Sequence, residues 1–441
     1  MTTVSLATLG CKVNQFESEA LMAGLEERGY HLVPFEEGAD ITIINTCCIT
    51  HRADFESRQM VRRALRRNPN SFIIVTGCYS QVEPEAFAHM GGVNYLLGNR
   101  EKTHIPDLLP MMMKGELPQI QVSDIQGEKL FSDISLYTFH HHTRAFLKIQ
   151  DGCNARCSYC IVPHARGPSR SLPPERVIEH LRVLKERDFK EVVLTGIHIG
   201  SYGLELTPVF TLEKLLQRLE VEETPHRIRL SSIEPLDFSA DLISTLSRSV
   251  KICPHLHIPI QSGDDDILKM MNRNYDHAFL SDLIRELHER IPEVSMGADV
   301  IVGFPGETEE RFKNTFKLID SLPLSYLHVF PFSKRKGTPA AQFLRRIDEK
   351  TVKQMAERMR DLGREKRRSF YRRFLHQELK VLVEDRKARG QGRWKGFSRN
   401  YIPVRLVNGG HCDLTNQECR VVVTEWSEKG VTGKVAEGQH G

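Results

Sequence analysis

The chain has 441 residues, enough for about three domains of roughly 150 residues each, and its hydrophobic fraction of 40% suffices for ordinary cores. No apolar run approaches the length of a membrane span, and no basic region near Met1 leads into an apolar stretch, so we expect neither a membrane protein nor a signal peptide. The net charge is only +4, but residues 364–405 alone carry 14 Lys or Arg against 4 Asp or Glu. Such a basic segment is typical of nucleic-acid binding, with a solvated surface as the alternative.

The first 120 residues alternate short apolar, β-branched runs with stretches that favour helix. Three of these runs end in a cysteine, at Cys11, Cys47 and Cys78, and predicted helices follow them at 17–28, 53–67 and 84–89. The alternation predicts a parallel sheet, whose strands have their carboxyl ends at one edge, where α/β sheets bind ligands. We therefore expect the three cysteines to converge there. The alternative is three separate buried thiols, a common environment for free cysteine.

Three more cysteines follow a polar linker over about 114–142. Cys153, Cys157 and Cys160 have the spacing C-x3-C-x2-C, which can direct three thiolates to three irons of a 4Fe–4S cluster and leave the fourth iron open. A zinc site is the alternative, but it normally needs four protein ligands and paired C-x2-C units, and a second C-x2-C is absent. The remaining cysteines are predicted to be structural or incidental: Cys48, Cys253, Cys412 and Cys419.

The middle of the chain repeats a strand–helix unit six times, which is too few for an eight-stranded barrel. The predicted strands are 145–150, 191–195, 227–232, 255–260, 296–302 and 326–330, and the helices include 175–186, 212–219, 242–246, 277–290 and 307–321. A site should lie at the carboxyl ends of these strands. The cysteine loop directly follows the first of them.

The last part of the chain, from near Phe374, has short predicted strands at 379–383, 400–407 and 420–423, which fit a small β-barrel. Within it, cations alternate with aromatic residues, a mixture suited to nucleic acid. The predicted RNA-binding residues are Arg393, Lys395 and Arg399, and the aromatic residues among them are Trp394, Phe397 and Tyr401. Packing of these aromatic rings in the barrel core is an equal alternative.

The motifs together resemble a known family. Tyr159, before the last cysteine of the loop, completes a signature similar to that of the radical S-adenosylmethionine (AdoMet) superfamily. The segments 9–19, 45–47 and 76–78 resemble the three N-terminal motifs of the methylthiotransferases, and the resemblance covers nearly the whole chain. Within that family, Cys-Lys-Val-Asn at 11–14 is similar to the branch that modifies N6-threonylcarbamoyladenosine in tRNA. The isopentenyladenosine branch tends to have Cys-Gln-Met-Asn.

The resemblance implies an α/β protein of three domains. These are an N-terminal α/β methylthiotransferase domain (1–120), an open (βα)6 partial barrel as radical AdoMet core (139–372) and a small C-terminal β-barrel of the RNA-binding TRAM type (373–441). It also implies AdoMet and two 4Fe–4S clusters, one on Cys153, Cys157 and Cys160 and an auxiliary one on Cys11, Cys47 and Cys78. The expected AdoMet contacts are Tyr159 of the cysteine-loop signature, the strand-end residues Gly196, Ser232, Glu234, Gln261 and Val300, and Arg273.

The implied reaction adds a methylthio group to C2 of N6-threonylcarbamoyladenosine, next to the anticodon. An aromatic C–H has no useful acidity, so a radical from AdoMet cleavage is the suitable tool, and the protein positions and shields it. The implied partners are the tRNA anticodon stem-loop, a reducing electron donor such as flavodoxin or ferredoxin, and a sulfur source, with no membrane. Six cysteines used as cluster ligands favour a reducing cytoplasm.

Three other functions stay open. An isopentenyladenosine tRNA methylthiotransferase would use the same chemistry on another N6 substituent. A ribosomal-protein aspartate methylthiotransferase would tend towards a more acidic C-terminal domain, against which the basic segment 364–405 argues. An RNA-binding iron–sulfur electron-transfer protein would need two clusters but no AdoMet pocket.

Overall fold

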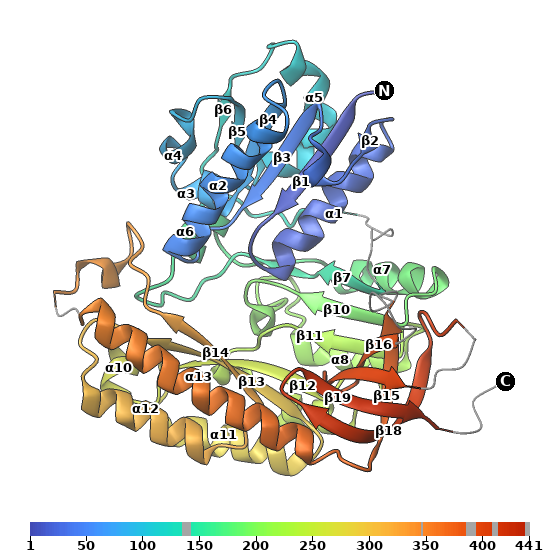
Figure 1. The fold of residues 1–441 in the computed structure, drawn as a ribbon, viewed down its shortest axis with the longest axis vertical. Helices are drawn as coiled ribbons and strands as arrows, with labels where there is room; N and C mark the ends of the chain where they lie inside the picture. Colours follow the sequence, from blue (N-terminus) through green and yellow to red (C-terminus); the bar gives the residue numbers. More distant parts are fainter. Residues whose placement is uncertain (135–142, 345–346, 385–393, 408–412, 437–441) are drawn as a thin grey trace.

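The computed structural model describes residues 1–134, 143–344, 347–384, 394–407 and 413–436, and Figure 1 shows three parts that follow one another along the chain. Cys412 and Arg393, to which the sequence analysis gave roles, lie outside these residues. Among the described helices, none combines the length and apolar character that crossing a membrane requires.

The N-terminal part is a parallel six-stranded sheet in the order β2-β1-β3-β4-β5-β6, with apolar clusters on both faces. Its central strand β3 is buried along its whole length, as expected for a parallel strand covered on both sides. The strands are β1 (Thr3–Thr8), β2 (His31–Leu32), β3 (Ile41–Thr46), β4 (Phe72–Gly77), β5 (Val93–Leu97) and β6 (Ile120–Gln121). The helices are α1 (Lys12–Glu26), α2 (His51–Arg67), α3 (Cys78–Val82), α4 (Glu85–Ala88) and α5 (Ile105–Met113).

The middle part is an open barrel of six parallel strands, as predicted. Two three-stranded sheets, β7-β10-β11 and β12-β13-β14, meet at a parallel bridge between Ile228 and Ile252. The six strands are β7 (Arg144–Lys148), β10 (Glu191–Thr195), β11 (Arg227–Leu230), β12 (His255–Gln261), β13 (Ser295–Val302) and β14 (Tyr326–Pro331). A short antiparallel pair, β8 (Gln150–Asp151) and β9 (Arg170–Ser171), flanks the cysteine loop.

Helices cover the outside of this barrel and bury one continuous apolar core between themselves and the strands. These helices are α7 (Pro174–Glu186), α8 (Leu212–Val221), α9 (Ala240–Arg248), α10 (Asp265–Met270), α11 (His277–Arg290), α12 (Glu309–Ser321) and α13 (Glu349–Arg372). The short helix α6 (Val162–Arg166) packs instead against α3 of the N-terminal part. The long helix α13, which was not predicted, runs beside β14 and leads into the last part of the chain (Figure 1).

The C-terminal part is a closed five-stranded barrel in the order β15-β16-β17-β19-β18, which confirms the predicted small β-barrel. The strands are β15 (Glu378–Glu384), β16 (Trp394–Ser398), β17 (Pro403–Val407), β18 (Glu418–Ser427) and β19 (Gly430–Val435). Trp394 is 7% exposed and packs in the core of this barrel, so the core alternative holds for this aromatic residue.

The two barrels are joined by buried charges. Arg227 and Arg229 of β11 each bind Glu191 of β10 at 2.8 Å, and both donate further hydrogen bonds to backbone carbonyls of the C-terminal barrel. Burial by itself would raise the pKa of Glu191, but the two arginines outweigh it and lower this pKa to about 2. The fully buried arginines thereby fix the C-terminal barrel against the open barrel.

Candidate active site

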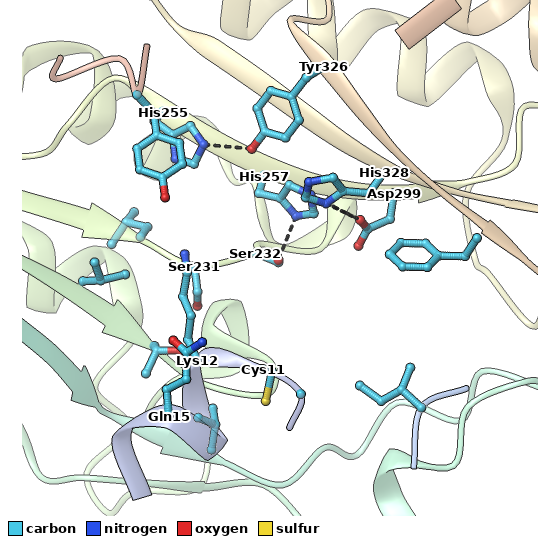
Figure 2. A pocket seen from close by; sticks show the side chains of 18 of the residues that line it. Cys11, Lys12, Gln15, Ser231, Ser232, His255, His257, Asp299, Tyr326 and His328 are labelled. Carbon is cyan, nitrogen blue, oxygen red and sulfur yellow. Dashed lines mark hydrogen bonds and ion pairs between the residues drawn. The ribbon is translucent and has the colours of Figure 1, made fainter. Parts of the chain in front are cut away.

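A cavity of about 1640 Å³ lies where the three parts meet, and each of them supplies side chains to its wall (Figure 2). The N-terminal sheet contributes Cys11 and Lys12, from the turn after β1 and the start of α1. The open barrel contributes the strand-end residues Gly196, Ser232 and Gln261, and its cysteine loop contributes Tyr159 and Cys160. Helix α13 contributes Arg367 and Tyr371, and the C-terminal barrel contributes Phe397 and Tyr401. The cavity therefore lies at the edge that the strand pattern predicts for a site.

Cys153, Cys157 and Cys160, here called the loop triad, lie between β8 and α6. The backbone N–H of Cys153 donates to Gly167 O at 3.0 Å, and the N–H of Cys160 donates to Cys157 O at 3.1 Å, so the loop is folded tightly. Burial and then the neighbouring thiolate of Cys157 raise the pKa of Cys160 to about 12. Three cysteine side chains in one tightly folded loop form the donor set that an iron–sulfur cluster needs.

The loop triad has a polar partner that the sequence reasoning missed. His198 Nδ1 lies 3.7 Å from Cys153 Sγ, while its Nε2 lies 2.7 Å from a carboxylate oxygen of Asp237. Burial favours the neutral ring, but Asp237 and Cys153 outweigh it and raise the pKa of His198 to about 10. The ring of His198 therefore connects Asp237 with one cysteine of the loop triad. The three residues are far apart in sequence and form no recognisable motif.

Three of the predicted AdoMet contacts form a chain beside the loop triad. Arg273 donates through Nη2 to Tyr159 Oη at 2.6 Å and pairs through Nη1 with Glu234. Gly196, Ser232 and Gln261 line the cavity as expected from their places at strand ends. Val300 differs from them, because its side chain is fully buried in the main core, and its neighbours Asp299 and Ile301 line the cavity instead. The alternation of side chains along β13 explains the difference.

Cys11, Cys47 and Cys78, here called the N-terminal triad, lie at the carboxyl ends of β1, β3 and β4, as the sheet pattern predicts. A Cβ added to Gly10 would stand only 3.0 Å from Cys47 Sγ, so the chain before Cys11 passes directly against the second cysteine. Burial raises the pKa of Cys47 to about 12, and the neighbouring thiolates of Cys78 and Cys11 add to this effect. The prediction that these cysteines converge is thus met by their positions.

A fourth thiol also lies at this edge. A hydrogen bond from Cys48 is the largest cause that lowers the pKa of Cys78 to about 5, and Arg166 adds to it, against the effect of burial. Arg166 Nε donates to Cys78 Sγ at 3.3 Å. The sequence analysis predicted Cys48 to be structural or incidental, and the structure adds that it contacts Cys78 of the N-terminal triad.

Beneath the N-terminal triad lies a buried charge network that no sequence motif indicates. Its members are Glu17 of α1, Lys102, Lys148 of β7, Asp151 of β8, Arg166 of α6 and Arg170 of β9. Arg166 binds Glu17 at 2.6 Å, and Lys148 binds both Glu17 at 3.1 Å and Asp151 at 3.2 Å. The network holds four cations against two carboxylates. Buried charges need compensation, and the adjacent thiolates can supply it.

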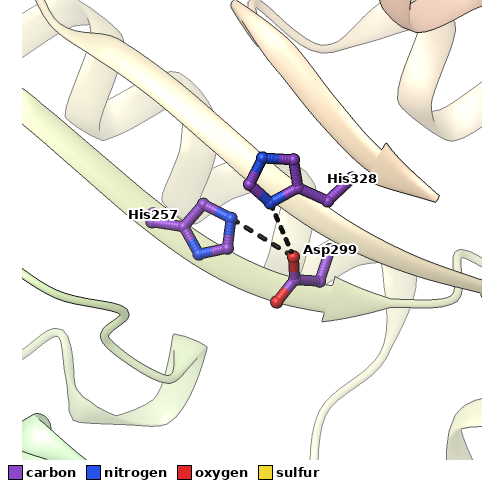
Figure 3. Close-up of side chains that lie close together, drawn as sticks. All are labelled: His257, Asp299 and His328. Atoms are coloured by element: carbon purple, nitrogen blue, oxygen red, sulfur yellow. Dashed lines mark ion pairs between the residues drawn. The ribbon is translucent and has the colours of Figure 1, made fainter. Parts of the chain in front are cut away.

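A third cluster of polar groups, His257, Asp299 and His328, lies on the concave side of strands β12, β13 and β14 (Figure 3). Both imidazoles contact the same oxygen of Asp299, His257 at 3.2 Å and His328 at 3.3 Å, and Ser232 lies 2.8 Å from the other nitrogen of His257. Burial by itself would raise the pKa of Asp299, but the two histidines outweigh it and hold this pKa below its usual range. Two imidazoles and a carboxylate are a donor set that also suits a divalent transition metal.

Of the predicted RNA-binding cations, Lys395 is exposed on β16, whereas Arg399 is engaged by the protein itself. Arg399 donates to the carbonyls of His226 at 2.9 Å and Val250 at 2.7 Å, both in the open barrel. Its guanidinium therefore joins the two barrels, and of these two residues only Lys395 is left facing solvent.

Glu307 is a buried carboxyl in the turn between β13 and α12. Its Oε2 accepts a hydrogen bond from Gly303 N–H at 2.5 Å, whereas Oε1 has no hydrogen-bond partner among the described residues. Burial is the largest cause that raises its pKa to about 7. Because this pKa lies above the ordinary value of 4.5, protonation favours the folded state, and the free energy of unfolding falls as the pH rises from 4.5 towards 7.

We therefore expect Glu307→Gln to remove part of the pH dependence of stability. Between about pH 5 and about pH 8 the wild-type protein should lose roughly 2–3 kcal/mol relative to this variant, as measured by denaturant unfolding. Glu310→Gln, which changes an exposed carboxyl of α12, is the control and should behave as wild type. Equal pH dependence in wild type and Glu307→Gln would contradict the raised pKa.

Two family models match the chain: the Radical SAM superfamily over residues 147–319 and the family described as "Uncharacterized protein family UPF0004" over residues 3–98. The threonylcarbamoyladenosine tRNA methylthiotransferase MtaB of Bacillus subtilis is 40% identical, over 97% of this chain and 99% of that protein. Its counterpart in Aquifex aeolicus is 35% identical, over 91% and 96%. The tRNA-2-methylthio-N(6)-dimethylallyladenosine synthase of Pelotomaculum thermopropionicum is 33% identical, over 100% and 99%.

Among solved structures, the radical S-adenosylmethionine methyltransferase TsrM from Kitasatospora setae is similar, with a TM-score of 0.57 and 15% identity over 77% of each chain. The cobalamin-dependent S-adenosylmethionine radical enzyme OxsB has a TM-score of 0.50 and 13% identity, over 81% of this chain and 56% of that one. At these identities the likeness concerns the fold, and it extends from the open barrel into a neighbouring part of the chain.

Proposed function

Because the chain belongs to the methylthiotransferase family of radical AdoMet enzymes, we propose that it adds a methylthio group to C2 of N6-threonylcarbamoyladenosine next to the anticodon of tRNA. The observation that carries the proposal is the shared cavity. Cys11 of the N-terminal triad and Cys160 of the loop triad line the same space, which is large enough for a nucleoside beside AdoMet. One base bound in this cavity could therefore reach both cysteine triads.

The family implies a 4Fe–4S cluster and AdoMet, and the three cysteines of the loop triad are suitable ligands for such a cluster. When bound, these groups supply an electron and a radical that can remove an unactivated aromatic hydrogen, for which no side chain is suited. The protein holds and shields the site. The Arg273–Tyr159 contact braces the loop triad, and the ring of Tyr159 packs edge-on against buried Phe304 at 6.5 Å.

We assign a second 4Fe–4S cluster to the N-terminal triad. Three observations support the assignment: the convergence of the cysteines, their access to the cavity through Cys11, and the excess of buried cations beneath them. Thiolates select such clusters, and a fourth iron without a protein ligand is the place where a sulfur could bind. A reducing protein such as flavodoxin or ferredoxin and a separate sulfur source belong to the same proposal.

The relatives favour the threonylcarbamoyl substrate over the alternatives. This chain is 40% identical to a protein named for that nucleoside and 33% identical to one named for the dimethylallyl derivative. An electron-transfer protein would have no use for a cavity of this size between its two cysteine triads. The deciding experiment is mass spectrometry of tRNA nucleosides from a deletion strain and its parent. We expect loss of the 2-methylthio derivative of N6-threonylcarbamoyladenosine alone, and an unchanged level would reject the proposal.

The C-terminal barrel gives a second test, because Lys395 and Arg399 differ in what they contact. Lys395→Ala should weaken tRNA binding and reduce the salt slope of log K by roughly 0.7–0.9, the value for one phosphate contact. Arg399→Ala should chiefly loosen the joint between the barrels and lower the Tm. Filter binding at several salt concentrations measures the first effect, and thermal unfolding measures the second. A normal salt slope for Lys395→Ala would place the RNA contact elsewhere.

A further inference from the structure

Lys12, the first residue of α1, is a cation in the cavity wall, and the residues that the structure describes give it no anionic partner. Figure 2 shows its side chain extending into the cavity from the same turn that carries Cys11. The residue is half-buried, and within the described part of the chain its amine makes neither a hydrogen bond nor an ion pair that would hold it. A partly buried ammonium group without a partner is costly to desolvate, and an anion bound at this place would offset that cost.

The arginines nearest to Lys12 already have carboxylates. Besides Glu191, which Arg227 and Arg229 share, Arg144 binds Glu384 at 3.0 Å and Arg227 binds Glu418 at 2.8 Å. These three arginines therefore each have a carboxylate partner, whereas no carboxylate among the described residues forms an ion pair with Lys12. A partly buried cation without such a partner favours an anionic ligand.

Lys12 is also free to turn towards a ligand, whereas the arginines are not. Arg229 donates to the carbonyls of Arg399 and Ser398, and its guanidinium lies 4.6 Å from the ring of Tyr401. The lysine amine stands on a flexible four-carbon stem and offers three donors in any direction. Gln15, Ser231 and Tyr401 also line the cavity and supply neutral polar groups around an anion.

We propose that Lys12 binds the carboxylate of the threonylcarbamoyl substituent and so selects this nucleoside over one with an uncharged N6 group. The inference rests on the proposed function, because it assumes that the modified adenine enters this cavity. A threonylcarbamoyl group ends in an amino-acid carboxylate, whereas a dimethylallyl group is wholly apolar. The shared chemistry is anion binding, and the competing source of an anion is a phosphate of the RNA backbone.

The test measures the affinity of the full-length protein for two anticodon stem-loops by fluorescence anisotropy. One carries N6-threonylcarbamoyladenosine, and the other carries the same nucleoside with its carboxylate converted to the neutral carboxamide. Wild type should bind the carboxylate RNA roughly 10- to 100-fold more tightly, as expected for a charge-assisted hydrogen bond in a partly buried site. Lys12→Gln should lose this preference, and Lys12→Arg, which keeps the charge, should retain much of it.

Lys429 provides the matched control, because it is a lysine on the rim of the same cavity but exposed, in the turn between β18 and β19. Lys429→Gln should keep the preference for the carboxylate. If Lys12→Gln weakened both RNAs equally and kept the preference, the anion would be a phosphate and the proposal would be overturned. It would also be overturned if wild type showed no preference. A wild-type enzyme that bound with the expected preference but formed no methylthio product would refute the proposed function instead.

Discussion

Changing Cys153, Cys157 and Cys160 together to Ala should abolish AdoMet cleavage and leave about four of the roughly eight irons that two clusters hold. The family uses a 4Fe–4S cluster, and the loop triad has the cysteine spacing and the tightly folded loop that we propose for it. Iron analysis and chromatography of 5′-deoxyadenosine after anaerobic reconstitution measure the two effects.

The reciprocal variant separates the two triads. Changing Cys11, Cys47 and Cys78 to Ala should also leave about four irons, but AdoMet cleavage should survive while methylthio insertion stops. Cys419→Ala removes a buried thiol of the C-terminal barrel, remote from both triads in the fold, and should keep all the iron. If the variant of the N-terminal triad held as much iron as wild type, those cysteines would be structural and the second cluster would have to be abandoned.

The sequence predicts most of what depends on local pattern. Strands such as β3 are recognisable because a parallel strand covered on both faces is rich in β-branched residues along its whole length, as in Ile41–Thr46. Parallel order then brings the ends of β1, β3 and β4 together without any knowledge of tertiary contacts, so the meeting of Cys11, Cys47 and Cys78 follows from topology alone.

What the sequence does not predict is how charged groups meet across domains. Glu17 and Arg166 are 149 positions apart and pair inside the protein, a contact that no periodicity encodes. Arg399 was assigned to RNA because cations among aromatic residues look exposed, but its donors reach carbonyls of the open barrel. Helix α13 was missed because a charged surface stripe masks its buried face, which contains Met355, Met359 and Leu362.

The buried charge network should make Arg166 one of the most sensitive positions in the protein. Arg166 is 1% exposed, binds Glu17 at 2.6 Å and Cys78 at 3.3 Å, and connects α6 of the open barrel with α1 of the N-terminal sheet. Arg166→Met keeps much of the volume but leaves Glu17 and its neighbours with one cation fewer. Removing one partner of a buried ion pair costs about 3–5 kcal/mol, which denaturant unfolding of the purified protein can measure.

The same substitution should affect the two triads unequally, which distinguishes it from a general loss of stability. Arg166 helps to lower the pKa of Cys78, so its loss should disfavour the thiolate of Cys78. The N-terminal triad should then bind iron less tightly, whereas the iron on the loop triad should be unchanged. AdoMet cleavage should therefore persist under conditions in which the variant stays folded, and methylthio insertion should fall. Arg248→Met, an exposed arginine of α9, is the control and should change neither. If Arg166→Met had the same free energy of unfolding as wild type, the ion pair with Glu17 would not stabilise the protein. The thiolates, and the auxiliary cluster that we propose on them, would then have to balance the excess of buried cations.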